Sequence, residues 1–116
     1  MYNYIQLKLV DLDYVAVADV KELLPGERLY ISIDEVQILV FNIDGKLYAI
    51  GDICSHDGNI LDDAAVEGFE VVCPRHGARF DVRNGKVTAL PAVVDIPAYP
   101  VRVTDGQIEV GVPKKP

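Results

Sequence analysis

The sequence predicts an all-β fold built from antiparallel strands. Apolar and polar residues alternate in several short segments, a period of two that places the apolar side chains on one face of a strand. Three pairs of turn residues separate such segments: Asp44-Gly45, Asn84-Gly85 and Asp105-Gly106. Asp-Gly and Asn-Gly tolerate the positive φ of a two-residue hairpin turn. Three signals of this kind in 116 residues favour antiparallel pairing.

The first half of the chain contains four expected strands and one short helix. The strands are expected over residues 4–10, 14–17, 29–33 and 36–41. Asp19 and Glu22 have the spacing of a capping box, with Asp19 as the N-cap. Pro25-Gly26 follows almost at once, so the helix has at most about two turns.

The second half contains further short strands and one proline-rich stretch. Strand-like segments occur at residues 47–50, 69–72, 101–103 and 108–112. Residues 89–100 contain three prolines, which lack a backbone donor, so we expect an extended crossover there and not a central strand. No linker or internal repeat is visible, and residues 1–116 are expected to form a single domain.

The composition restricts the class of protein. A net charge of −7 argues against nucleic-acid binding, which requires clustered Lys and Arg to neutralise phosphates. No apolar run approaches the roughly 20 residues that span a bilayer, so no membrane contact is expected. The N-terminus lacks the basic start and apolar core of a secretion signal. These features predict a cytoplasmic protein.

Both cysteines and both histidines lie in two short segments. The segments are Cys54-Ser55-His56 and Cys73-Pro74-Arg75-His76, with sixteen residues between them. Each follows a strand-like segment, so a sheet can bring the two side by side. Two thiolates and two imidazoles suit an iron–sulfur cluster or zinc. A disulfide between the two cysteines is not expected in a reducing cytosol.

The residues around these segments resemble the two cluster-binding boxes of Rieske-type proteins. The first box is Ala49-x-x-Asp52-x-Cys54-Ser55-His56, and the second is Cys73-Pro74-x-His76-Gly77-x-x-Phe80-Asp81. The resemblance extends outward to Leu61, Gly68, the Asn84-Gly85 turn and the crossover, over roughly residues 45–103. It implies a Rieske-like antiparallel β-sandwich with a cluster-binding subdomain of two hairpin loops, at approximately residues 46–88.

The resemblance also implies one [2Fe–2S] cluster per chain and its four metal ligands. Cys54 and Cys73 would bind the inner iron, and His56 and His76 the outer iron. Two thiolates balance the charge of two ferric ions and two sulfides, so reduction takes the site from neutral to singly negative. Four thiolates would start from a negative site, which accepts an electron less readily. Histidine ligation therefore raises the potential above that of four-cysteine ferredoxins.

Departures from the family pattern indicate a low-potential subtype. The high-potential respiratory members join the loops by a disulfide at positions that correspond to Asn59 and Arg75. They also carry hydroxyl groups where this chain has Ala78 and Phe80. Fewer hydrogen bonds to sulfur stabilise the reduced cluster less. This subtype suits electrons from an NAD(P)H-dependent flavoprotein reductase and not from quinol.

The sequence is interpreted as a soluble Rieske-type ferredoxin, an electron-transfer component and not itself an enzyme. By resemblance, it passes one electron from the reductase to a terminal oxygenase, for example an aromatic-ring-hydroxylating one. It does not activate oxygen itself, because it has no histidine left for a mononuclear iron site. Two alternatives stay open: the small subunit of an assimilatory nitrite reductase, and a zinc-stabilised interaction module.

Charged residues flank both boxes. An acidic run near the first box either steers a basic reductase surface or is simply solvated: Asp57, Asp62, Asp63 and Glu67. Arg75 and Arg79 flank the second box; they could tune the potential or help docking, but the preferred interpretation is that they are ordinary surface residues.

Overall fold

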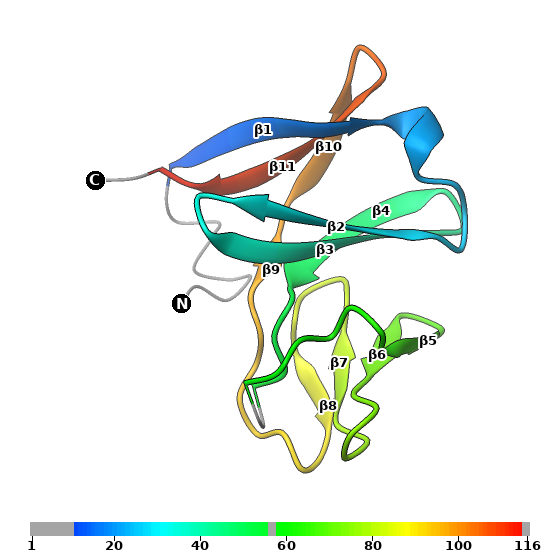
Figure 1. Cartoon of the computed structure of the whole chain (residues 1–116), viewed down its shortest axis with the longest axis vertical. Helices are drawn as coiled ribbons and strands as arrows, with labels where there is room; N and C mark the ends of the chain where they lie inside the picture. Colours follow the sequence, from blue (N-terminus) through cyan, green and yellow to red (C-terminus); the bar gives the residue numbers. More distant parts are fainter. Residues whose placement is uncertain (1–10, 56–57, 115–116) are drawn as a thin grey trace.

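The structure is a computed structural model that describes residues 11–55 and 58–114 (Figure 1). Its described strands form three antiparallel sheets of three, four and four strands. The all-β prediction is therefore confirmed. The strand expected over residues 4–10 lies outside the described residues.

The first sheet contains β1 (Leu12–Asp19), β10 (Val101–Thr104) and β11 (Gln107–Pro113), in the order β1-β11-β10. The β10–β11 turn is Asp105-Gly106, whose φ angles of 51° and 77° suit a type I′ hairpin. β1 covers the strand expected over residues 14–17. Both predictions are confirmed.

A single turn of 3₁₀ helix, η1 (Val20–Glu22), follows β1. The Asp19 side chain accepts the N–H of Lys21 at 2.9 Å, and the Glu22 carboxylate accepts the N–H of Asp19 at 3.2 Å. The predicted capping box is therefore present. Within the described ranges, no helix has the length and apolar character needed to cross a bilayer.

The second sheet contains β2 (Arg28–Ile33), β3 (Val36–Ile43), β4 (Lys46–Gly51) and β9 (Ala98–Tyr99), in the order β2-β3-β4-β9. Asp44-Gly45 joins β3 to β4 with φ angles of 53° and 88°, as predicted. Asp34-Glu35 joins β2 to β3 with φ angles of 50° and 69°, and no sequence signal predicted this turn. The left-handed region is sterically unfavourable for a glutamate, so the pairing of the two strands must impose it.

The third sheet lies at the opposite end of the molecule from the first (Figure 1). It contains β5 (Ala65–Glu67), β6 (Glu70–Val72), β7 (Arg79–Asp81) and β8 (Val87–Ala89), in that order. β6 falls in the expected segment at residues 69–72. β5 and β7 were not predicted, because strands of three residues are too short to show a period.

The turn at Asn84-Gly85 differs from the two-residue hairpin that the sequence predicts. Only Gly85 of the pair has a positive φ, at 76°. The N–H of Asp81 donates to the carbonyl of Lys86 at 2.8 Å, which leaves residues 82–85 in a longer loop. The loop places Gly85 against the crossover, where its carbonyl accepts the N–H of Ile96 at 2.9 Å. A tertiary contact, invisible in the local sequence, selects this turn.

The proline-rich crossover joins the outer strands of two sheets. It runs from β8, at one edge of the third sheet, to β9, at one edge of the second. The Asp95 side chain accepts the N–H of Val87 at 2.9 Å and fastens the crossover to β8. An extended crossover was predicted, and the structure adds that Ala98–Tyr99 forms an edge strand.

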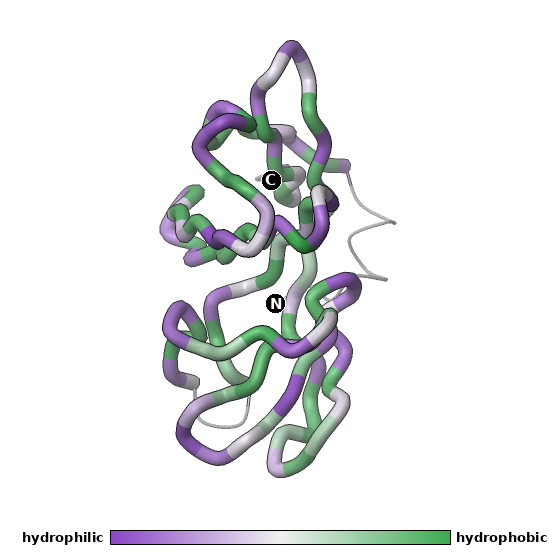
Figure 2. The backbone as a smooth tube through the Cα atoms, turned by 90° about the vertical axis from the view of Figure 1, so that its right-hand side faces the viewer, coloured by the Kyte–Doolittle hydropathy of each residue, from purple (hydrophilic) through white to green (hydrophobic). Residues whose placement is uncertain are grey.

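Two separate hydrophobic cores hold the sheets together. The sandwich core contains residues of the first and second sheets, among them Ile38, Val40 and Ile108. The site core contains residues of the second and third sheets together with both cysteines, for example Leu39, Phe41 and Phe80. Hydrophobic stretches accordingly occur in both the upper and the lower half of the molecule (Figure 2). β3 contributes to both cores, because its alternate side chains point to opposite faces.

Gly85→Ala is expected to destabilise the fold far more than Gly106→Ala. Both glycines have a φ near 77°, so both changes carry the same backbone strain of about 1 kcal/mol. A Cβ on Gly85 would lie 2.0 Å from the carbonyl oxygen of Ile96, whereas one on Gly106 would have nothing within 4 Å. The clash should bring the cost of Gly85→Ala to about 3–5 kcal/mol. The midpoint of thermal unfolding, followed by circular dichroism, measures both; equal losses would contradict the contact.

Candidate metal centre

The first of the two loops predicted to hold metal follows β4 and closes on its own cysteine. The N–H of Cys54 donates to the carbonyl of Asn59 at 2.8 Å, and the N–H of Gly58 donates to the carbonyl of Cys54 at 2.7 Å. Gly58 has a φ of 74°, which an L-residue rarely adopts, so glycine at this position closes the loop without strain.

The second loop follows β6 and repeats this backbone pattern at the same offsets from its cysteine. The N–H of Cys73 donates to the carbonyl of Ala78 at 2.8 Å, and the N–H of Gly77 donates to the carbonyl of Cys73 at 2.9 Å. Gly77 has a φ of 77°. The two loops therefore hold their cysteines in equivalent backbone settings, although their histidines stand at different offsets, Cys-x-His and Cys-x-x-His.

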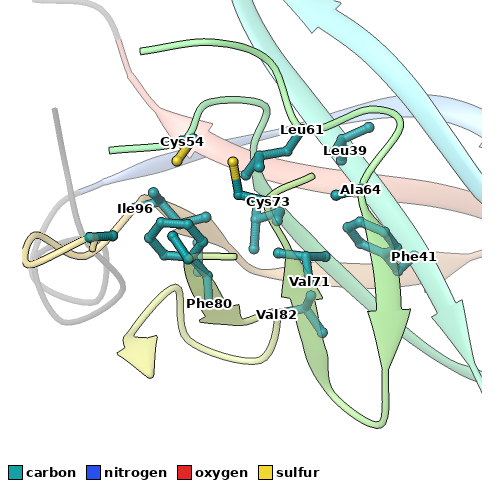
Figure 3. Close-up of a cluster of buried hydrophobic side chains, with 14 residues drawn as sticks. Leu39, Phe41, Cys54, Leu61, Ala64, Val71, Cys73, Phe80, Val82 and Ile96 are labelled. Atoms are coloured by element: carbon teal, nitrogen blue, oxygen red, sulfur yellow. The ribbon is translucent and has the colours of Figure 1, made fainter. Parts of the chain in front are cut away.

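Both cysteines are buried and belong to the site core. Cys54 is 0% exposed and Cys73 is 1% exposed. Figure 3 shows both sulfur atoms at the same side of this core, with Leu61 and Ile96 nearby. They are not joined in a disulfide. The fold thus brings together two thiols that are nineteen positions apart in the chain.

One of the two predicted histidines, His76, can be placed in the structure. His76 is exposed, three residues after a cysteine that is almost fully buried. The other predicted ligand, His56, lies outside the described residues. The second loop therefore runs from the core at Cys73 to the surface at His76 within four residues.

Asp52 braces the first loop, a role that sequence reasoning missed. Its Oδ1 accepts the N–H of Leu61 at 2.6 Å, which ties the beginning of the loop to its end. Burial raises the pKa of Asp52 above its ordinary value of 3.8, and this bond partly opposes the rise. The available signal was the position of Asp52 in the first motif, two residues before Cys54.

The crossover braces the first loop from another side. The hydroxyl of Ser55 donates to the carbonyl of Val94. Ala92 and Ile96 of the same crossover are buried in the site core beside Cys54. The proline-rich stretch is therefore part of the wall of the site, in addition to being a connection between sheets.

Asp81 organises the chain after the second motif. Its Oδ1 accepts the N–H of Arg83 at 2.9 Å, and its Oδ2 accepts the Arg83 guanidinium at 2.8 Å. Burial alone would raise the pKa of Asp81, but the hydrogen bonds and the charge of Arg83 outweigh it and hold the pKa below its ordinary value of 3.8. Arg83 also stacks on Phe69, with its Cζ atom 4.2 Å from the ring centroid.

The acidic run does not form one uniform surface. Glu67 pairs with Arg79 at 3.0 Å, and Glu70 pairs with the same guanidinium at 3.3 Å. These bonds tie β5 and β6 to β7, so Glu67 and Arg79 have a structural role within the third sheet. Asp63 is exposed and Asp62 partly exposed, whereas Asp57 lies outside the described residues.

Ala78 and Phe80, which stand where the high-potential family members carry hydroxyl groups, are both buried. Ala78 and Phe80 are each 0% exposed and belong to the site core with the cysteines. Neither side chain has a donor to offer to a sulfur atom. The environment of the thiols is therefore apolar on this side.

The arrangement suits a metal centre with a buried sulfur side and an exposed nitrogen side. The two thiols lie in an apolar core, neither is used in a disulfide, and an imidazole from the same loop reaches the surface. Thiolates and imidazoles together favour iron–sulfur clusters or zinc among biological metals. The fold and the two matched loops are those expected of a small β-protein with such a metal centre.

The chain belongs to the Rieske [2Fe–2S] domain family, which matches residues 13–100. Its cofactor is therefore a Rieske [2Fe–2S] cluster. The donor set described above fits this group, because a Rieske centre requires two thiolates and two imidazoles.

Known proteins of this family resemble the chain closely. It is 42% identical over 104 residues to the 3-phenylpropionate/cinnamic acid dioxygenase ferredoxin subunit of Escherichia coli (strain K12), with 84% of this chain and 90% of that protein covered. The ferredoxin of carbazole 1,9a-dioxygenase from Nocardioides aromaticivorans IC177 superposes with a TM-score of 0.80 at 38% identity, covering 87% of this chain and 98% of the other.

Two further solved structures are similar to the chain and come from proteins that work with a partner. A complex of reduced oxygenase and oxidised ferredoxin in carbazole 1,9a-dioxygenase contains a chain with a TM-score of 0.80 at 25% identity, covering 88% of this chain and 95% of that one. A structure described as an NADH-dependent nitrite reductase small subunit from Mycobacterium tuberculosis has a TM-score of 0.79 at 25% identity, covering 90% and 99%.

Asp81→Asn is expected to lower the free energy of unfolding by about 1 kcal/mol at pH 7, because a charge-assisted pair with a partly exposed arginine is lost. The pKa of Asp81 is lower in the folded chain than in the unfolded chain, so its stabilisation is complete above the unfolded pKa, near 3.8. It is lost as the pH falls through the folded pKa. The stability difference between wild type and variant should therefore be constant from pH 7 to about pH 5 and shrink below it.

Arg83→Met is the matched control, because it removes the other partner of the same pair. It should reproduce the pH dependence of Asp81→Asn. Unfolding measured across this pH range in both variants checks the assignment. A difference that stayed constant down to pH 2 would show that Asp81 acts without its charge.

Proposed function

We propose that the protein is the ferredoxin component of an oxygenase system. It takes one electron from an NAD(P)H-dependent flavoprotein reductase and passes it to a terminal oxygenase of the aromatic-ring-hydroxylating kind. The observation that carries this proposal is the pair of matched loops, each with one buried cysteine, in a chain whose relatives are ferredoxin subunits of dioxygenases. In this role it transfers electrons and has no catalytic reaction of its own.

Cys54 and Cys73 are proposed to bind the inner iron, and His56 and His76 the outer iron. Burial of both thiols supports the first assignment, and the exposure of His76 supports the second. His56 follows from its place in the motif, because it lies outside the described residues. When bound, the cluster supplies a site that gains and loses a single electron.

The residues of the chain set the conditions for that transfer. The apolar site core excludes water from the thiol side, so the electron enters and leaves at the imidazole side. Exposed apolar side chains lie in and beside the first loop, namely Ile60, Val93 and Val94. Such a surface suits transient docking of a partner close to His76, because Ile60 accepts a hydrogen bond from the neighbouring Arg75. The exposed Asp63 adds a negative charge in the same segment, which suits a basic partner.

A reduction potential at the low end of the Rieske range is proposed. Ala78 and Phe80 are buried beside the cysteines and have no hydroxyl to donate, which stabilises the reduced state less. This range suits electrons that come from NAD(P)H through a flavin.

The chain is proposed to be a single cytoplasmic domain, with residues of about 46–88 as its cluster-binding unit. The site core supports this division only in part, because it also includes Leu39 and Phe41 of β3, and Ala92 and Ile96 of the crossover. The unit therefore depends on residues that lie outside it.

The nitrite reductase alternative is supported by one similar structure at 25% identity, against 42% and 38% for the dioxygenase ferredoxins. A stable complex with a large sirohaem subunit would favour it. Membership of the Rieske family leaves no support for the zinc-stabilised interaction module.

Protein purified without air should be red-brown and should give a rhombic spin-half EPR signal after reduction with dithionite. The low average g value of this signal is typical of histidine-ligated [2Fe–2S] clusters. Turnover of a dioxygenase with its reductase should then depend on the added protein. A colourless, EPR-silent protein with one bound zinc, even after iron–sulfur reconstitution, would overturn the proposal.

His56→Cys and His76→Cys should each lower the reduction potential where the cluster assembles, because a thiolate adds a negative charge to the site. Cys54→Ser and Cys73→Ser should abolish assembly. Visible absorption measures cluster content, and a redox titration followed by EPR measures the potential. An unchanged potential in a fully assembled histidine variant would exclude that histidine as a ligand.

A further inference from the structure

The side chain of Arg75, in the second loop, reaches the backbone of the first loop. Its Nη2 donates to the carbonyl oxygen of Ile60 at 3.0 Å, over a separation of fifteen residues in the sequence. Ile60 follows directly after Asn59, whose carbonyl closes the first loop on Cys54. Arg75 precedes His76 in the second loop. The bond therefore joins the two cysteine-bearing loops to each other at their exposed side.

The other arginines near the site are used differently. Arg79 pairs with Glu67 and Glu70, and these bonds fasten strands of the third sheet. Arg83 pairs with Asp81, two residues away in the same turn. Arg75 donates to a backbone carbonyl of the opposite loop. Its cationic charge therefore lies beside the exposed part of both loops.

The remaining braces hold each loop to its own surroundings. Asp52 ties the first loop to its own beginning, and Ser55 ties it to the crossover. The second loop closes on Cys73 through Gly77 and Ala78. These bonds fix the shape of each loop, whereas the Arg75 bond joins one loop to the other and adds to the packing of both loops in the site core.

We propose that Arg75 is a positioning residue that fastens the two ligand loops together and stabilises the reduced cluster. The inference rests on the ligand assignment proposed above. A cluster held by both loops is released when the loops separate, and the bond from Arg75 to Ile60 opposes that separation. Reduction adds one negative charge to the site, which a nearby fixed cation favours. The two effects have different physical causes and can be measured separately.

The test uses the cluster-loaded protein and three variants. Arg75→Met removes both the bond and the charge. Arg75→Lys keeps the charge, but its side chain is one atom shorter and does not reach the same carbonyl at the same backbone position. Arg79→Met is the matched control, because it removes one positive charge from the same box without breaking a bond between the loops.

Two quantities are measured on each protein. Cluster release is the first-order loss of visible absorbance in the presence of an iron chelator, and Arg75→Met should speed it about tenfold. The ratio of reduced to oxidised protein at a fixed solution potential should fall about threefold in Arg75→Met, a shift of about 28 mV for a one-electron couple. Arg75→Lys should speed release by a similar factor while keeping a potential close to that of wild type.

The control separates this role from a general effect of surface charge. Arg79→Met should change both quantities much less than Arg75→Met. The potential difference should shrink at high salt, because the charge of an exposed arginine is screened, whereas the difference in release rate should persist. Equal effects of the Arg75→Met and Arg79→Met variants, or unchanged release in Arg75→Met, would overturn the proposal. If Arg75→Met fails to assemble a cluster, Arg75→Lys carries the test.

These outcomes are distinguishable from a failure of the proposed function. The EPR spectrum of the wild-type protein decides first whether a histidine-ligated cluster is present. A wild-type Rieske signal with no effect of Arg75 would remove only the role of Arg75. A wild-type protein without that signal would remove the ligand assignment itself.

Discussion

The central constraint on this structure is that two buried thiols must lie side by side although their loops are distant in the sequence. Each loop closes on its own cysteine through the same two backbone hydrogen bonds, so the loop shapes are fixed locally. The position of one loop relative to the other is fixed by the site core, which packs residues of two sheets around both cysteines. Local hydrogen bonding and long-range packing therefore contribute different parts of one site, and loss of either would separate the sulfur atoms.

The division into buried sulfur and exposed nitrogen links this packing to electron transfer. Apolar side chains surround the thiols, while His76 reaches the surface only three residues after Cys73. A partner can therefore approach the imidazole side without any opening of the core. Ala78 and Phe80 are part of this apolar packing and have no hydroxyl group to donate, which connects the core to the expected low potential.

The proline-rich crossover connects two sheets and also forms part of the wall around Cys54. Its prolines suit an extended path, and this path runs past the first loop, where Val94 accepts the hydroxyl of Ser55. Gly85 allows the crossover to approach the third sheet, because any side chain at that position would collide with the carbonyl of Ile96. The crossover therefore couples the stability of the third sheet to the wall around Cys54.

The all-β class could be predicted from the sequence alone, as could two of the three expected hairpin turns, the capping box at Asp19 and the metal-binding motifs. These features rest on local chemistry: the period of strands, the backbone freedom of Asp-Gly, and the ligand preferences of Cys and His. Other features came from tertiary packing: the turn at Asn84-Gly85, the strained turn at Glu35, and the braces made by Asp52 and Arg75. Each of these depends on a neighbour that packing brings close, and the local sequence does not identify that neighbour, even where, as at Asp52, the residue stands in a motif.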